Sequence, residues 1–250
     1  MHLAKLYNSK IVKNYIFCFF GRKGGVSSGN FSSLNCSFNE DDKNSNVVKN
    51  RKIVNESLGF KKKIIFLNQV HSTKVEFIDR PRKKILTADS MFTCRKDVFL
   101  GILTADCAPL IVLGKKYFGI IHVGWRGALD GIIENTIDAM MKKGEKVQNF
   151  YIFIGPHLMK RSFEIRNDFV NFLLGKCKQN EVYVEEIENK KFFDFSKFIL
   201  DIIKKIGIKK IEISHENTYT NNSKYFSYRF LSKRGIKNCG RQISLVGIKD

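Results

Sequence analysis

The sequence predicts an α+β fold for this chain of 250 residues. Segments with strand character and segments with helical spacing are mixed, without the regular βαβ repeat of a doubly wound sheet. No G-x-G-x-x-G or Walker sequence follows a predicted strand. No internal repeat or low-complexity linker divides residues 1–250, so we expect a single domain with one sizeable core.

The first half of the chain is expected to contain a helix at 47–58, ended by Gly59 and preceded by a polar loop that starts at Asn39. Four apolar runs in this half predict strands. These runs lie at 64–67, 75–78, 100–103 and 118–121.

In the second half, apolar residues recur at helical spacing over 129–141, which predicts one helix that ends at Gly144. A strand at 150–154 follows, and Gly155-Pro156 breaks it, so His157 is expected in a loop. The remaining predicted elements are helices at 165–174 and 195–206 and a strand at 208–214.

Composition favours a globular chain, because hydrophobic residues make up 43% and only 3 prolines occur. No run approaches the ~20 apolar residues that a membrane helix needs. The apolar stretch at 11–20 is interrupted by Lys13 and Asn14 and lacks a cleavage site, so it is not a signal peptide. The scattered cysteines form no C-x-x-C pair, and we therefore expect reduced thiols and a cytoplasmic location.

The net charge of +20 invites a nucleic-acid hypothesis. The lysines are distributed, however, and mostly flank apolar runs in short clusters. Phe, Ile, Asn and Lys are all abundant, which is the bias of an AT-rich genome. We therefore predict no specific nucleic-acid partner, although a basic field would attract phosphate and other anions.

Three segments carry the chemistry: Asn-Gln-Val-His-Ser at 68–72, Thr-Ala-Asp-Cys-Ala-Pro at 104–109, and His-Val-Gly-Trp-Arg-Gly at 122–127. Each offers one metal-binding side chain, namely His71, Cys107 and His122. One thiolate with two imidazoles suits zinc, and three protein ligands leave a fourth position for water or substrate. Cys107 and His122 are expected just past strand ends, where sheet proteins place polar chemistry on a rigid support.

These segments resemble the multicopper polyphenol oxidase or laccase-domain family, whose members are described as zinc-dependent purine nucleoside phosphorylases. The resemblance runs nearly end to end. It includes the segments at 22–27, 33–35, 50–51, 88–89, 154–156, 163–165, 193–195, 227–229 and 240–242.

The resemblance implies a single-domain, mixed-sheet αββα sandwich with zinc at His71, Cys107 and His122. It also implies purine nucleosides and phosphate as substrates: adenosine, inosine, guanosine and 5'-methylthioadenosine would give free base and sugar 1-phosphate. Deamination of adenosine is a second activity of the family. His157 stands where the family has Cys, and it would place a substrate-binding imidazole or a fourth metal ligand near the pocket.

Phosphate would be held by Arg22, which matches a family segment, and by Arg126 beside a predicted helix N-terminus. A structural ion pair is the alternative role for Arg126. Asp106 is a candidate general acid/base, or a hydrogen-bond partner of His71 or His122.

Trp125 would stack on a purine base, with packing in a turn as its alternative role. Arg229, beside Tyr228, would close the pocket and bind substrate.

Other classes of function stay open. A cysteine hydrolase would use Cys107 with His71 or His122, and a cell-wall precursor editing enzyme would place another substrate in the same pocket. A copper-dependent polyphenol oxidase needs several histidine-rich sites, which 5 histidines cannot supply. The histidines are His2, His71, His122, His157 and His215.

Overall fold

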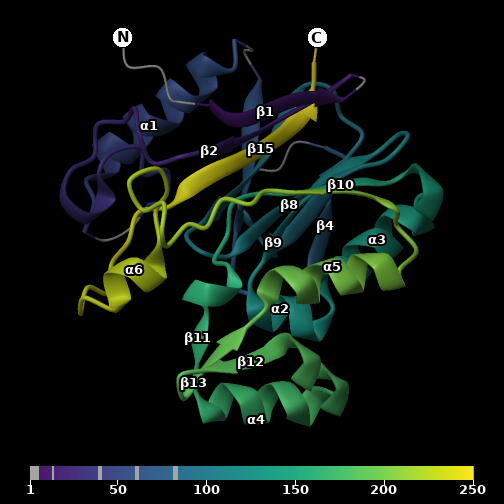
Figure 1. Cartoon of the computed structure of the whole chain (residues 1–250). Coiled ribbons are helices and arrows are strands. Elements are labelled where there is room, and N and C mark those ends of the chain that lie inside the picture. Colours follow the sequence, from purple (N-terminus) through teal and green to yellow (C-terminus); the bar gives the residue numbers. More distant parts are fainter. Residues whose placement is uncertain (1–5, 13, 39–40, 60–61, 81–83, 250) are drawn as a thin grey trace.

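The computed structural model describes residues 6–12, 14–38, 41–59, 62–80 and 84–249; His2, Lys13 and Asn39 lie outside them. Two six-stranded sheets face each other, and helices cover their outer faces (Figure 1). The layers are therefore helix, sheet, sheet, helix, which confirms the predicted α+β sandwich.

The first sheet has the order β1-β2-β15-β7-β3-β5. The strands β1, β2, β15 and β7 pair antiparallel, whereas β7, β3 and β5 pair parallel. Their bounds are Leu6–Val12 (β1), Tyr15–Phe20 (β2), Gln242–Ile248 (β15), Val98–Thr104 (β7), Lys63–Asn68 (β3) and Leu86–Thr87 (β5).

The second sheet has the order β14-β10-β8-β9-β6-β4. Its edge pairs are parallel and its central pairs antiparallel. The bounds are Lys210–Ile213 (β14), Tyr151–Ile154 (β10), Ala108–Leu113 (β8), Phe118–Val123 (β9), Ser90–Thr93 (β6) and Val75–Phe77 (β4).

A small three-stranded sheet lies beside α4 at one end of the molecule (Figure 1). Its strands, in spatial order, are β11 (Glu164–Ile165), β13 (Lys190–Phe193) and β12 (Val184–Ile187). The α-helices are α1 (Asn44–Ser57), α2 (Trp125–Asp130), α3 (Ile132–Lys142), α4 (Asn167–Lys176), α5 (Phe195–Lys205) and α6 (Tyr228–Ser232). Short 3-10 turns occupy Gly29–Phe31, Val147–Asn149, Lys160–Ser162 and Lys178–Tyr183.

Side-chain alternation along the strands builds the layers. On β2, Phe17 and Phe19 point between the two sheets, while Phe20 packs in the core beneath α1. On β8, Ile111 points between the sheets and Leu110 packs toward α3 and α5. Because these strands are buried on both faces, they read as continuous apolar runs rather than as alternating patterns.

The predicted helix at 129–141 is two helices. Gly131 adopts φ 95°, a left-handed conformation that ends α2, and α3 begins at the next residue. Apolar spacing alone did not reveal this break. The other predicted elements are confirmed with small shifts at their ends, such as α4, which starts after Ile165 because Ile165 pairs in β11.

Several strands were not predicted: β1, β2, β5, β6, β8, β15 and the small sheet. The strand β15 inserts between β2 and β7. The residues of β15 therefore pair with residues of β2 that lie more than 200 positions earlier in the chain. Such pairing leaves no local signal in the sequence. In the described part of the chain, every helix is too short or too polar to cross a bilayer.

Candidate metal centre

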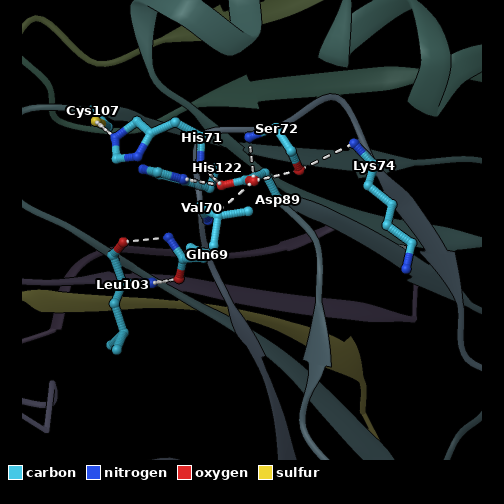
Figure 2. Close-up of polar contacts among 9 residues, drawn as sticks. All are labelled: Gln69, Val70, His71, Ser72, Lys74, Asp89, Leu103, Cys107 and His122. Carbon is cyan, nitrogen blue, oxygen red and sulfur yellow. Dashed lines mark hydrogen bonds and ion pairs between the residues drawn. The ribbon is translucent and has the colours of Figure 1, made fainter.

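His71, Cys107 and His122 converge, and their ligand atoms all lie within 4.8 Å of one another. The Sγ atom of Cys107 is 3.7 Å from Nε2 of His71, and the two imidazole rings are 4.8 Å apart between centroids (Figure 2). A tetrahedral zinc ion would hold such ligand atoms roughly 3.4–3.7 Å apart. The donor set and its spacing therefore fit a bound metal ion.

The centre spans the gap between the two sheets. His71 follows β3 of the first sheet and adopts a left-handed φ of 59°. Cys107 lies in the turn that links β7 of the first sheet to β8 of the second. His122 lies inside β9, one residue before its end, and not beyond the strand as predicted.

Asp89 fixes both histidines, and the sequence did not identify it as a site residue. Its carboxylate accepts five hydrogen bonds (Figure 2). The donors are Nδ1 of His122 at 2.8 Å, the backbone amides of Val70, His71 and Ser72, and the Ser72 hydroxyl. This arrangement leaves Nε2 of His122 available to a metal ion.

The same contacts govern the charge of Asp89. Burial by itself raises the pKa of Asp89, but the hydrogen bonds from His122 and Ser72 outweigh it and hold that pKa far below its usual range. Asp89 is therefore a carboxylate at any pH near neutrality. Asp89 directly precedes β6 and lies in the segment at 88–89 that matches the family. That match was the only sign in the sequence that Asp89 belongs to the site.

Two further residues hold the His71 turn in place. The Gln69 side chain donates to the Leu103 carbonyl and accepts from the Leu103 amide, both at 2.8 Å, which ties the turn to β7. Gly124 packs directly against the site: a Cβ atom there would lie 2.5 Å from Cδ2 of His71. Any side chain at 124 would therefore displace His71.

The Cys107 thiol and the His122 imidazole shift each other's pKa. Burial by itself raises the pKa of Cys107, but His122 and His71 outweigh it and lower that pKa to about 6. Burial by itself lowers the pKa of His122, but Cys107 and Asp89 raise it to about 9. Near neutral pH the site therefore holds a thiolate, which is the form that binds metals and acts as a nucleophile.

A cavity of about 600 Å³ opens beside the three ligands, and its volume is typical of small-molecule sites. Arg126, Arg229 and Arg241 line it together with aromatic side chains, including Trp125 and Phe163. Among the described residues, none of these three arginines forms an ion pair with a carboxylate. The cavity therefore combines a metal-binding end with guanidinium groups that form no ion pair among the described residues.

Arg126 and Trp125 both reach the cavity. The Arg126 guanidinium lies 4.3 Å from the centroid of the Trp125 ring, and the Arg126 side chain is exposed. The other side of Trp125 packs on Phe169 and Phe172 of α4, at 4.6 and 5.6 Å between ring centroids. Trp125 is therefore packed, as one of its two predicted roles requires, and it also lines the cavity, while its stacking on a base stays a prediction.

In the described part of the chain, no hydrogen bond joins the Asp106 carboxylate to His71 or His122, which was one of its two predicted roles. Its carboxylate accepts from the Thr218 hydroxyl and from the Arg229 backbone amide, both at 2.6 Å. Burial raises the pKa of Asp106. Arg229 also donates to the Glu164 carbonyl at 2.6 Å, so Asp106 and Glu164 together hold Arg229 at the cavity wall.

Arg22 is not among the residues that line the cavity, contrary to its predicted phosphate contact. Its guanidinium donates to the carbonyls of Ser32 at 2.6 Å and Asn222 at 2.9 Å, and stacks on Phe226. Burial lowers the pKa of Arg22. Arg22 therefore joins two loops that are distant in sequence.

His157 was predicted to bind substrate or metal, but it is not among the residues that line the cavity or that form the metal-binding group. The residue is fully buried, and its ring nitrogens lie 2.8 Å from the Gly155 carbonyl and 2.8 Å from the Ser196 hydroxyl. Burial lowers its pKa. The backbone of His157 bridges to Asn217, so the turn after β10 carries the imidazole into the core.

Comparison with known proteins shows what the chain resembles. The profile of the multi-copper polyphenol oxidoreductase laccase family matches residues 16–249. A purine nucleoside phosphorylase of Rickettsia conorii is 32% identical over 215 residues, which cover 84% of this chain and 86% of that protein. One from Pseudomonas aeruginosa is 27% identical over 243 residues, 93% of each chain. A solved structure from Neisseria meningitidis matches with a TM-score of 0.86 at 26% identity, over 98% of this chain and 100% of that one.

Proposed function

Because the chain belongs to the multi-copper polyphenol oxidoreductase laccase family, we propose that it is a zinc-dependent purine nucleoside phosphorylase. The observation that carries the proposal is the shared cavity: a His71-Cys107-His122 centre and unpaired guanidinium groups face the same space. The names of the Rickettsia and Pseudomonas relatives support the same activity.

Zinc is proposed in preference to copper because one thiolate and two imidazoles leave an open position for substrate or water. Oxidation by several copper ions needs several histidine-rich sites, and the chain has 5 histidines in all. When bound at this centre, zinc would supply Lewis-acid chemistry, either by polarising a substrate atom or by activating water.

In the proposed reaction, a phosphate oxygen forms a bond to C1' of the nucleoside and the bond from C1' to N9 breaks. The electron pair of that bond goes to the purine, which takes up a proton, and sugar 1-phosphate is the second product. Adenosine, inosine, guanosine and 5'-methylthioadenosine are the proposed nucleosides. Deamination of adenosine by water, giving inosine and ammonia, is proposed as a second activity of the same site.

The residues of the chain have distinct proposed roles. Guanidinium groups at the cavity wall neutralise phosphate, and the Trp125 ring stacks on the base. Asp106 acts as a positioning residue, because its hydrogen bond from the Arg229 amide fixes the start of α6. Asp89 orients His122 in the same indirect way.

Metal analysis of wild-type protein and Cys107→Ala, paired with an assay for phosphate-dependent release of hypoxanthine from inosine, tests the proposal. We expect about one zinc per chain in the wild type, and loss of both zinc and phosphorolysis in the variant. Cys177→Ala is the matched control, because Cys177 is exposed and does not line the cavity. Wild-type protein without metal or phosphorolysis would contradict the proposal.

A cysteine hydrolase is the second candidate, and a specific observation favours it. Cys107 has a lowered pKa, His122 stands beside it, and Asp89 orients His122, which is the order of groups in a nucleophilic triad. Removal of metal separates the two candidates: a phosphorylase loses activity and regains it with zinc, whereas a hydrolase stays active until Cys107 is alkylated. A cell-wall precursor assayed in parallel tests the third possibility, an editing enzyme that uses this pocket.

A further inference from the structure

Thr104 presents an unsatisfied hydroxyl at the cavity. It is the last residue of β7 and shares its face with Leu100 and Ile102, which pack between the two sheets. The residue is 1% exposed, and among the described residues its Oγ1 atom has no hydrogen-bond partner. Buried hydroxyls nearly always have a partner, so this hydroxyl is available to a bound ligand.

Arg241 lies beside Thr104 at the same end of the first sheet. Gln242, the next residue, pairs with Thr104 in the β7-β15 ladder. The Gln242 side chain is already engaged with both backbone groups of Phe226, so it does not satisfy the Thr104 hydroxyl. The Arg241 guanidinium lines the cavity, and its one hydrogen bond to a described residue goes to the Cys239 carbonyl at 3.1 Å.

A third cavity-lining residue, Ser37, is held by the same support as Arg241. The side-chain oxygen of Asn35 accepts from the backbone amides of Ser37 and Arg241, both at 3.0 Å. Asn35 is itself fully buried, and its side-chain nitrogen donates to Asp42 at 2.6 Å. One buried amide therefore sets the backbone on both sides of this part of the wall.

We propose that Arg241, with the hydroxyl groups of Thr104 and Ser37, binds the phosphate cosubstrate. The inference rests on the proposed function and deepens it. One guanidinium and two hydroxyls supply donors for several phosphate oxygens, and a charged group that is partly shielded from water forms stronger bonds than an exposed one. The subsite replaces Arg22, which was one of the two phosphate contacts predicted from the sequence and which the fold uses to join loops.

The test is steady-state kinetics of inosine phosphorolysis in Thr104→Val, Ser37→Ala and Arg241→Gln. Phosphate is varied at saturating inosine, and inosine is then varied at saturating phosphate. We expect the KM for phosphate to rise about 10-fold in Thr104→Val and roughly 100-fold in Arg241→Gln. The KM for inosine and the zinc content should stay at their wild-type values.

Valine matches the shape of threonine, and removing an unpaired hydroxyl should leave the melting temperature unchanged or higher. Thr104→Ser should keep the wild-type KM for phosphate because it keeps the hydroxyl. Arg161→Gln is the charge-matched control: Arg161 is exposed, pairs with Glu185 at 3.7 Å and does not line the cavity. Should Arg241→Gln fail to fold, the two hydroxyl variants carry the test.

An unchanged KM for phosphate in folded variants overturns the subsite and leaves the phosphorylase proposal standing. A rise in the KM for inosine alone also overturns it, because these groups would then contact the nucleoside. If wild-type protein shows no phosphorolysis, the proposed function fails, and calorimetric titration with inorganic phosphate decides the subsite. Binding by wild type that is about 10-fold weaker in Thr104→Val supports the subsite, whereas no binding by wild type overturns it.

Discussion

Two parts of the cavity wall differ in how far the protein satisfies its own polar groups. At the metal end, Asp89 accepts five hydrogen bonds and Gln69 uses both of its amide atoms. Beside β15, the Arg241 guanidinium and the Thr104 hydroxyl keep unused hydrogen-bonding capacity among the described residues. The metal end is thus fixed in advance, while the β15 side needs a ligand to complete its bonds.

The two parts also differ in charge. The metal end carries the Asp89 carboxylate and a thiol whose pKa is lowered to about 6, beside His122, whose pKa is raised to about 9. The arginine-lined wall is cationic and, among the described residues, forms no ion pair with a carboxylate. An anionic cosubstrate is therefore attracted to the arginine-lined wall.

The largest effect is expected from Asp89→Asn, which keeps the shape of the side chain and removes its charge. The asparagine side chain has one acceptor oxygen, whereas both oxygens of the Asp89 carboxylate accept hydrogen bonds. In the variant, His122 and the His71 turn therefore lose part of their support. We expect the zinc dissociation constant to rise about 10–100-fold. Competitive titration with a chromophoric chelator measures it.

Asp97→Asn is the matched control, because Asp97 is an exposed carboxylate that pairs with Arg95. It should bind zinc like the wild type. Equal zinc affinity in wild type and Asp89→Asn would show that the metal end does not depend on its hydrogen-bond support, and the contrast between the metal end and the β15 side would then be lost.

The sequence revealed the metal end better than the β15 side of the cavity for a physical reason. His71, Cys107 and His122 each follow or end an apolar run, so local pattern predicted their elements. Asp89 is found only through its partners. Arg241 and Thr104 meet because β15 inserts beside β7, a pairing across more than 130 residues that no local pattern records.

The same distinction between local pattern and long-range pairing decided which elements of the fold could be predicted. Helices α1 and α5 were predictable because their apolar spacing is local, whereas β2 and β15 owe their place to long-range pairing. His157 shows the limit of matching short segments. Its position beside a family segment suggested the pocket, but the turn after β10 carries the ring into the core.

A pH profile of thiol reactivity is the second way to sharpen the contrast. In metal-free protein the pKa of Cys107 is lowered to about 6, so the thiolate is present above pH 6 and is lost as the pH falls through that value. Alkylation by iodoacetamide should rise between pH 5 and 7 and then level off, whereas an ordinary thiol titrates near pH ~8.5. Mass spectrometry of the Cys107 peptide measures the rate.

Cys107→Ser supplies the background from the other thiols, and zinc added before the reagent should protect Cys107. A midpoint near that of an ordinary thiol would mean that His71 and His122 do not stabilise the thiolate. The metal end would then be less organised before metal binding than its hydrogen bonds indicate.

The smallest effect is expected from Arg126→Gln, and it separates the exposed cation from the half-buried one. Arg126 is exposed and stacks on Trp125, so water and salt screen its charge. We expect the KM for phosphate to rise only about 2–5-fold at low ionic strength and the difference to vanish in roughly 0.5 M salt. The effect of Arg241→Gln should persist at the same salt concentration, because Arg241 is less exposed than Arg126.

The KM for phosphate could instead rise more in Arg126→Gln than in Arg241→Gln at both salt concentrations. Phosphate would then bind on the Trp125 side of the cavity, and the unused donors beside β15 would serve another ligand.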